Sequence, residues 1–198
     1  MVIVGITGGI GSGKGLATGF FRTRGAAVVD ADVVAREVVQ PGSPLLHQIA
    51  AAFGRDTLQS DGSLDRSRLA EAAFASPEAV AKLNAIVHPP VLAEIGRRLQ
   101  RLARQGKTQV ACVVAPLLLE AGARRTVDRL LVMRAEEGER VRRVMARDGL
   151  TESEVRRRMA AQMPPDVQAQ EADWVVDTTA GKGKALAQLE RIWAELTG

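Results

Sequence analysis

A glycine-rich segment near the N-terminus, GGIGSGKG at residues 8–15, constrains the fold more than any other feature of the sequence. It follows a β-branched run, VIVGI (2–6), which is typical of a strand covered on both faces. An amphipathic stretch from about Gly15 to Arg24 follows it and predicts a helix. A strand, a glycine loop carrying a lysine, and a helix form the arrangement in which main-chain N–H groups bind phosphate. A glycine-rich turn with a chance lysine would lack this context.

The segment has the residue types that phosphate binding needs. Glycine lets the backbone approach a phosphate where a Cβ would clash, and the helix N-terminus adds its positive dipole end. Lys14 supplies a point charge that can reach the β- and γ-phosphates. The predicted nucleotide-binding residues of this segment are Gly9, Gly11, Ser12, Gly13, Lys14, Gly15 and Leu16.

Gly15 departs from the usual pattern, which has Ser or Thr directly after the lysine. The missing hydroxyl normally helps to hold Mg²⁺. Because Mg²⁺ keeps several waters and binds largely through substrate phosphates, we expect weaker metal positioning without loss of binding. No protein side chain is therefore predicted as a metal ligand.

Strand and helix patterns alternate along the rest of the chain. Further strands are expected at 26–32, 108–116, 127–133 and 173–179, and helices at 33–39, 44–53, 91–105, 136–147 and 183–196, with one more after the capping box of Thr151 and Glu154. The pair Pro89–Pro90 is expected to break the helical run before residue 91. Five strands separated by helices predict a parallel α/β sheet with ligands at its carboxyl edge. The helical stretch from 65 to 105 exceeds a simple crossover and predicts a small helical subdomain.

Two acidic residues and a row of arginines are candidates for the chemistry. Asp30 and Asp32 end the second expected strand, where one could accept a proton and the other cap the next helix; both could equally be turn residues. Arg140, Arg143 and Arg147 share one helix face at i, i+3 and i+7, so they could close over a nucleotide or form a solvated face.

The amino-acid composition limits the kinds of molecule that the chain is expected to bind. The net charge of +4 suits an anionic small molecule, whereas an aromatic content of 3% with no Tyr argues against a nucleic-acid partner. The single cysteine, Cys112, is expected to be a buried thiol in a reducing compartment. No apolar stretch reaches the ~20 residues of a membrane helix, and the N-terminus enters a strand without a basic leader. A cytoplasmic protein without a membrane partner is expected; the oligomeric state is not predicted.

Several segments in order resemble the dephospho-coenzyme A kinase family: GITGGIGSGK, VVDADVVAR, LNAIVHPPV, VVAPLLLEAG, RVRRVMARDGLTESEVRRRMAAQ and ADWVVDTTAG. The resemblance runs essentially from end to end. It implies a single domain over 1–198 with a P-loop NTPase-type three-layer α/β fold and a five-stranded parallel sheet. It also implies a helical substrate-binding insert at about 60–95 and a helical lid at about 136–165.

The resemblance also implies an activity: transfer of the ATP γ-phosphate to the ribose 3′-hydroxyl of dephospho-coenzyme A, with Mg²⁺. Asp32 would be the general base, and Lys14, Arg140, Arg143 and Arg147 would stabilise the phosphoryl group. The acceptor site would be lined by His88, Pro116, Leu117 and Glu120, with Thr178 near the adenine of ATP. Because Gly15 replaces the usual hydroxyl residue, a nucleotide-binding protein with weakened or no transferase activity is the alternative.

Overall fold

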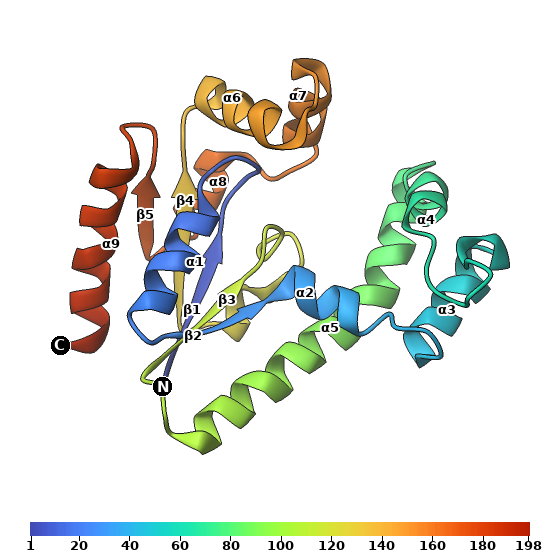
Figure 1. Ribbon diagram of the computed structural model, residues 1–198, viewed down its shortest axis with the longest axis horizontal. Helices are drawn as coiled ribbons and strands as arrows, with labels where there is room; N and C mark the ends of the chain where they lie inside the picture. The colour runs from blue at the N-terminus through green and yellow to red at the C-terminus, as the bar shows by residue number, and fades with distance from the viewer. The chain divides into compact units, whose positions relative to one another are not determined.

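The computed structural model describes residues 1–198 and contains a five-stranded, all-parallel sheet in the order β2-β3-β1-β4-β5 (Figure 1). The strands are β1 (Val2–Thr7), β2 (Ala27–Asp30), β3 (Val110–Val114), β4 (Arg129–Arg134) and β5 (Trp174–Asp177). All five of the strands expected from the sequence are present, each within a few residues of its expected bounds. Chain contacts divide the molecule into two compact units, Met1–Asp30 with Leu99–Gly198, and Ala31–Arg98.

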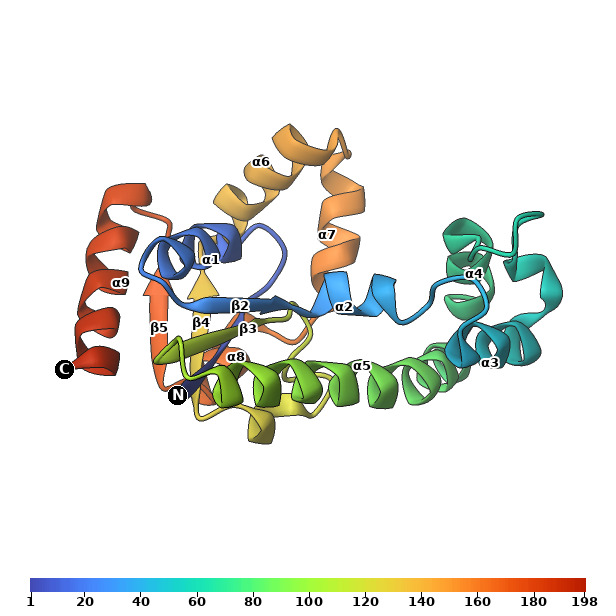
Figure 2. The same cartoon turned by 60° about the horizontal axis from the view of Figure 1, so that its bottom comes forward.

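The first unit holds the sheet and several helices. These are α1 (Lys14–Thr23), the last residues of α5 (Pro77–Gln105), η2 (Ala123–Thr126), α6 (Glu137–Asp148), α7 (Glu152–Ala160), α8 (Pro165–Gln170) and α9 (Lys182–Thr197). Helices α6 and α7 form a hairpin beside the loop that joins β1 to α1 (Figure 2). The predicted capping box of Thr151 is confirmed, because its hydroxyl accepts from the Glu154 N–H and the Glu154 carboxylate accepts from the Thr151 N–H.

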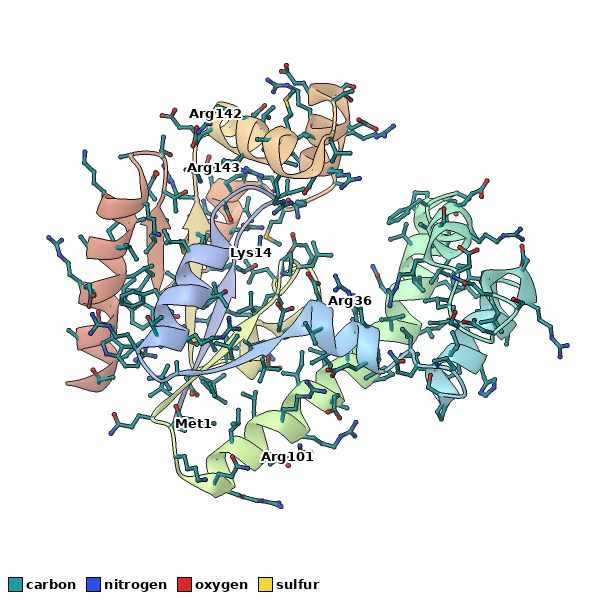
Figure 3. The ribbon with its side chains drawn as sticks, in the orientation of Figure 1. Met1, Lys14, Arg36, Arg101, Arg142 and Arg143 are labelled. Carbon is teal, nitrogen blue, oxygen red and sulfur yellow. The ribbon has the colours of Figure 1, made fainter.

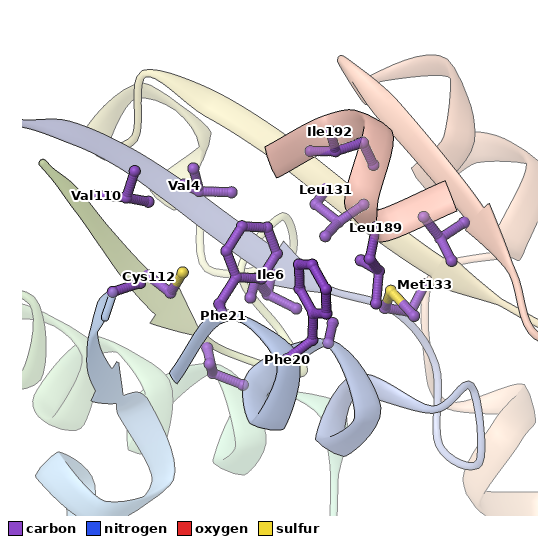
Figure 4. Packing of buried hydrophobic residues seen from close by; sticks show 14 of the residues in the cluster. Val4, Ile6, Phe20, Phe21, Val110, Cys112, Leu131, Met133, Leu189 and Ile192 are labelled. Atoms are coloured by element: carbon purple, nitrogen blue, oxygen red, sulfur yellow. The ribbon is translucent and has the colours of Figure 1, made fainter. Parts of the chain in front are cut away.

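The main core of this unit lies between one face of the sheet and helices α1 and α9 (Figure 4). Strand β3, VACVV, is buried at every position, as expected for the central part of a parallel sheet with both faces covered. Cys112 is fully buried there, and burial raises the pKa of its thiol to about 12. It is therefore a packing residue.

The second unit is helical. It contains α2 (Ala31–Glu37), α3 (Pro44–Phe53), η1 (Arg55–Thr57), α4 (Arg66–Ala73) and most of α5. Its own small core gathers around Val39, Leu45, Ile49 and Leu69. Ser43 caps α3 and Asp65 caps α4, each accepting main-chain N–H bonds through its side chain.

The second strand is shorter than expected. It ends at Asp30, so Asp32 lies in the first turn of α2, and the expectation that both acidic residues end this strand is wrong for Asp32. The reason lies in its one partner: β3 stops at Val114, opposite Asp30, and Pro116 beyond it has no N–H to extend the ladder.

The expected break at Pro89–Pro90 is also wrong, because α5 runs through both prolines. They leave the carbonyls of Ala85 and Ile86 without helical donors, which normally interrupts a helix. Apolar side chains are packed or buried on both sides of the pair, at Ile86 and Val87 before it and at Val91 after it. This packing holds the helix together across the defect.

No helix is both long enough and apolar enough to cross a lipid bilayer.

Candidate active site

The glycine loop joins the carboxyl end of β1 to the N-terminus of α1. Gly13 precedes the helix with φ 93°, in the left-handed region, and offers no side chain to cap it. The first N–H groups of α1 therefore have no competing side-chain acceptor at the N-cap, and the helix dipole points toward this position. This is the geometry of an anion site.

Neighbouring protein atoms leave no room for a side chain at several loop glycines. This steric requirement adds to the close approach of a phosphate expected from the sequence. A Cβ on Gly8 would strike the carbonyl oxygen of Met133, and one on Gly9 would strike the guanidinium of Arg140. At Gly11 it would lie 2.7 Å from the Arg140 carbonyl oxygen. The loop is thus seated directly on β4 and α6, and its shape depends on them.

Lys14 folds back over this loop. Its Nζ donates to the carbonyl oxygens of Gly8 at 2.6 Å and Gly9 at 3.1 Å. The ammonium group is therefore held at the loop by its own main chain, beside the helix N-terminus (Figure 3).

Thr178, directly after β5, ties the loop to α6. Its hydroxyl donates to the Ser12 carbonyl at 3.1 Å and accepts from Nη1 of Arg143 at 2.7 Å. Nη2 of Arg143 donates to the Thr178 carbonyl at 2.9 Å, and Nε donates to Glu139. Arg143 is consequently fixed on the side of α6 that faces the loop, whereas Arg142 lies on the outer side (Figure 3).

The two other predicted arginines have different surroundings. Arg140 is 6% exposed; its Nε donates to the Ile10 carbonyl at 2.9 Å, and burial lowers the pKa of its guanidinium against the opposing charge of Glu137. Arg147 is exposed and paired with Asp148, whose hydrogen bond raises the pKa of Arg147. The face of α6 that carries the three arginines is therefore buried at Arg140 and exposed at Arg147.

A pocket of about 240 Å³ opens between the loop and α6. It is lined by Gly11, Ser12, Gly13, Lys14, Gly15, Arg143, Val144 and Arg147. Three cationic side chains beside a helix N-terminus make it suited to a polyphosphate. Arg140 does not line this pocket, since its guanidinium lies beside Gly9.

The remaining predicted residues fall in both units. After β3, Pro116 accepts a hydrogen bond from Thr7 at 3.3 Å, Leu117 is 46% exposed, and Glu120 accepts from the Met163 N–H at 3.0 Å. In the second unit, Asp32 is exposed in α2 and His88 is half-buried in α5.

No pattern in the sequence points to Gln162, which follows α7. Its Oε1 accepts from the Ile10 N–H at 2.8 Å, a contact between residues 152 positions apart. The glutamine ended one of the recognised segments, but neither spacing nor charge pattern indicated what it touches.

The same overall fold occurs in small kinases of known structure. Shikimate kinase from Acinetobacter baumannii superimposes with a TM-score of 0.55 at 13% identity, covering 100% of this chain and 96% of that one. This similarity shows the fold alone. Together with the lysine-bearing loop and the cationic pocket, the fold defines a P-loop nucleotide-binding protein.

Closer relatives identify the family. The family model for dephospho-CoA kinase matches residues 2–183. A dephospho-CoA kinase from Corynebacterium glutamicum is 45% identical over 196 residues, covering 99% of this chain and 98% of that protein. The crystal structure of TT1252 from Thermus thermophilus is 36% identical with a TM-score of 0.86, covering 100% of this chain and 98% of that one. The chain belongs to the dephospho-CoA kinase family and is an ATP-dependent kinase.

Proposed function

We propose that this chain transfers the γ-phosphoryl group of ATP to the ribose 3′-hydroxyl of dephospho-CoA. The observation that carries the proposal is the pocket at the N-terminus of α1, where Lys14, Arg143 and Arg147 converge on the glycine loop. Membership of the family supports the choice of acceptor.

In the proposed reaction the chain contributes position and charge. The loop N–H groups and Lys14 hold the β- and γ-phosphates, and Arg143 and Arg147 neutralise charge on the transferring group. Arg140 adds its charge from behind the loop, beside Gly9. The acceptor oxygen bonds to the γ-phosphorus as the bond to the β-phosphate oxygen breaks, and Asp32 takes the hydroxyl proton.

We propose that the second unit, Ala31–Arg98, includes the helical acceptor-binding part expected at about 60–95, and that the segment from about 136 to 165 is the lid. His88 of the second unit would contact the acceptor. From the sheet-bearing unit, Pro116, Leu117 and Glu120 would do the same, because they follow the carboxyl end of β3, where ligands of parallel sheets bind. Thr178, whose hydroxyl contacts the glycine loop, would lie near the adenine, as the family resemblance implies.

Mg²⁺ fits this site if it is held through phosphate oxygens and water. An ideal Cβ on Gly15 meets no atom within 4 Å, so the position of the missing hydroxyl is open to a water ligand. When bound, the metal neutralises charge on the phosphates.

The direct test incubates the protein with ATP, Mg²⁺ and dephospho-CoA and follows the acceptor by mass spectrometry. We expect an acceptor heavier by one phosphate, with ADP formed in equal amount, and a product whose 3′-position carries the phosphate. Binding of ATP without any product over a wide Mg²⁺ range would contradict the proposal and favour a nucleotide-binding protein instead.

The Gly15→Ser variant tests the account of the metal. The open space accepts the side chain, so the variant should fold and gain about 0.5 kcal/mol of stability from replacing a helical glycine. Its hydroxyl should lower the Mg²⁺ concentration needed for half-maximal activity, measured by titrating Mg²⁺ at fixed ATP.

Gly19→Ser is the matched control, because Gly19 lies in the same helix and an added Cβ there also meets nothing within 4 Å. It should raise the melting temperature and leave the Mg²⁺ titration unchanged. Equal Mg²⁺ curves for both variants and the parent would show that the missing hydroxyl does not limit metal use.

A further inference from the structure

The peptide unit between Gly9 and Ile10 is held from both of its edges. On one edge, the Gly9 carbonyl accepts from Nζ of Lys14 at 3.1 Å and from the Ser12 N–H at 3.2 Å. On the other, the Ile10 N–H donates to Oε1 of Gln162 at 2.8 Å. In a trans peptide the C=O and N–H point in opposite directions, so partners on opposite edges fix the rotation of the whole plane.

The next peptide unit is fixed from one edge only. Nε of Arg140 donates to the Ile10 carbonyl at 2.9 Å. The N–H of the same peptide belongs to Gly11 and therefore points the opposite way, and Gly11 lines the pocket beside Lys14. Arg140 thus sets the direction of a main-chain donor at the phosphate site.

The Ile10 side chain completes the attachment. It packs against Val141, Val144 and Val155 in the small core between α6 and α7. Ile10 is consequently anchored to the hairpin by its carbonyl and its side chain, and to the segment directly after the hairpin by its N–H. The top of the glycine loop and the α6–α7 hairpin are one connected structure.

We propose that Gln162 is a positioning residue for the nucleotide: it holds the Gly9–Ile10 peptide so that the Gly9 carbonyl stays on Lys14 and the loop N–H groups stay directed at the phosphates. The effect on transfer rests on the function proposed above, whereas the effect on ATP binding does not. Gln162 acts through the loop and need not touch ATP itself. Any displacement of the segment after α7 would move this peptide as well.

The test replaces Gln162 by Met, which has a similar length but no strong acceptor, and by Glu, which keeps an acceptor oxygen. Loss of one such hydrogen bond corresponds to about a five- to tenfold change in an equilibrium. We expect Gln162→Met to weaken ATP binding, measured by calorimetry without acceptor, by about that factor. The KM for ATP should rise in parallel, with the KM for dephospho-CoA unchanged.

Hydrogen–deuterium exchange of the Ile10 amide provides a readout of the contact itself. Exchange should accelerate in Gln162→Met and stay close to that of the parent in Gln162→Glu. Gln170→Met, an exposed change at the end of α8, is the matched control and should alter neither exchange nor ATP binding.

Two results would overturn the proposal. One is unchanged ATP affinity in Gln162→Met; the other is a lower melting temperature with all kinetic constants preserved, which a purely structural contact would give. If the parent protein binds ATP but does not phosphorylate dephospho-CoA, the proposed function fails, and the calorimetry and exchange comparisons still decide the role of Gln162.

Discussion

Replacing Asp32 by Asn should lower kcat by about 10²–10⁴-fold, the range typical of losing a general base. Asn keeps the size of the side chain and can still accept a hydrogen bond, but it cannot take the proton of the acceptor hydroxyl. The KM values for ATP and dephospho-CoA should change little, since the uncharged variant still fills the same space. Steady-state kinetics with both substrates varied would separate these effects.

The position of Asp32 in the chain supports this expectation. Asp30, the last residue of β2, pairs with Val114, which in turn pairs with Ile6 just before the glycine loop. Asp30 therefore lies at the same carboxyl edge of the sheet at which the glycine loop begins. Asp32 follows two residues later in the chain. Catalytic groups of parallel sheets lie at this edge.

The Asp30→Asn variant distinguishes between the two carboxylates, either of which could be the general base on the sequence alone. It changes the residue directly before α2, and because Asn and Asp are about equally good at a helix start, both stability and kcat should change little. A large loss of kcat in Asp30→Asn with little loss in Asp32→Asn would assign the base to Asp30 and contradict the proposal for Asp32.

Local patterns in the sequence predicted most of the fold. A buried β-branched run, a helix start marked by Thr151 and a strand made wholly of small apolar residues each act within a few neighbouring positions. The two errors arose where distant packing decided the outcome. The α5 helix continues through Pro89 because side chains on both sides of it are packed or buried, and β2 stops where its partner strand ends.

In the candidate site, too, local patterns predicted some features, whereas others depend on distant packing. The motif placed Lys14 and the glycines, and helical spacing placed three arginines on one face. The helical spacing could not show that Arg140 is buried while Arg147 is exposed, because burial depends on how α6 packs against the loop. Nor could it pair Ile10 with Gln162, since no local rule connects residues so far apart in the chain.

Lys14→Met should lower kcat by about 10²–10³-fold, the cost typical of removing one well-placed donor to transition-state charge. Met preserves the length of the side chain and removes its charge. The change also deletes both bonds from Nζ to the carbonyls of Gly8 and Gly9, so the loop itself loses order. ATP affinity, measured by calorimetry, should therefore fall together with the rate.

Lys182→Met is the matched control, because Lys182 is an exposed lysine that begins helix α9 as Lys14 begins α1. It removes the same charge from the first turn of a helix that carries no glycine loop, and both kcat and ATP affinity should remain unchanged. Lys14→Arg should recover only part of the loss, since the larger guanidinium, with its donors fixed in a plane, cannot take the place of the compact ammonium group between the two carbonyls. Full activity in Lys14→Arg would mean that net charge at this point is sufficient. Full activity in Lys14→Met would remove Lys14 from the reaction and leave Arg143 and Arg147 as the cations that line the pocket.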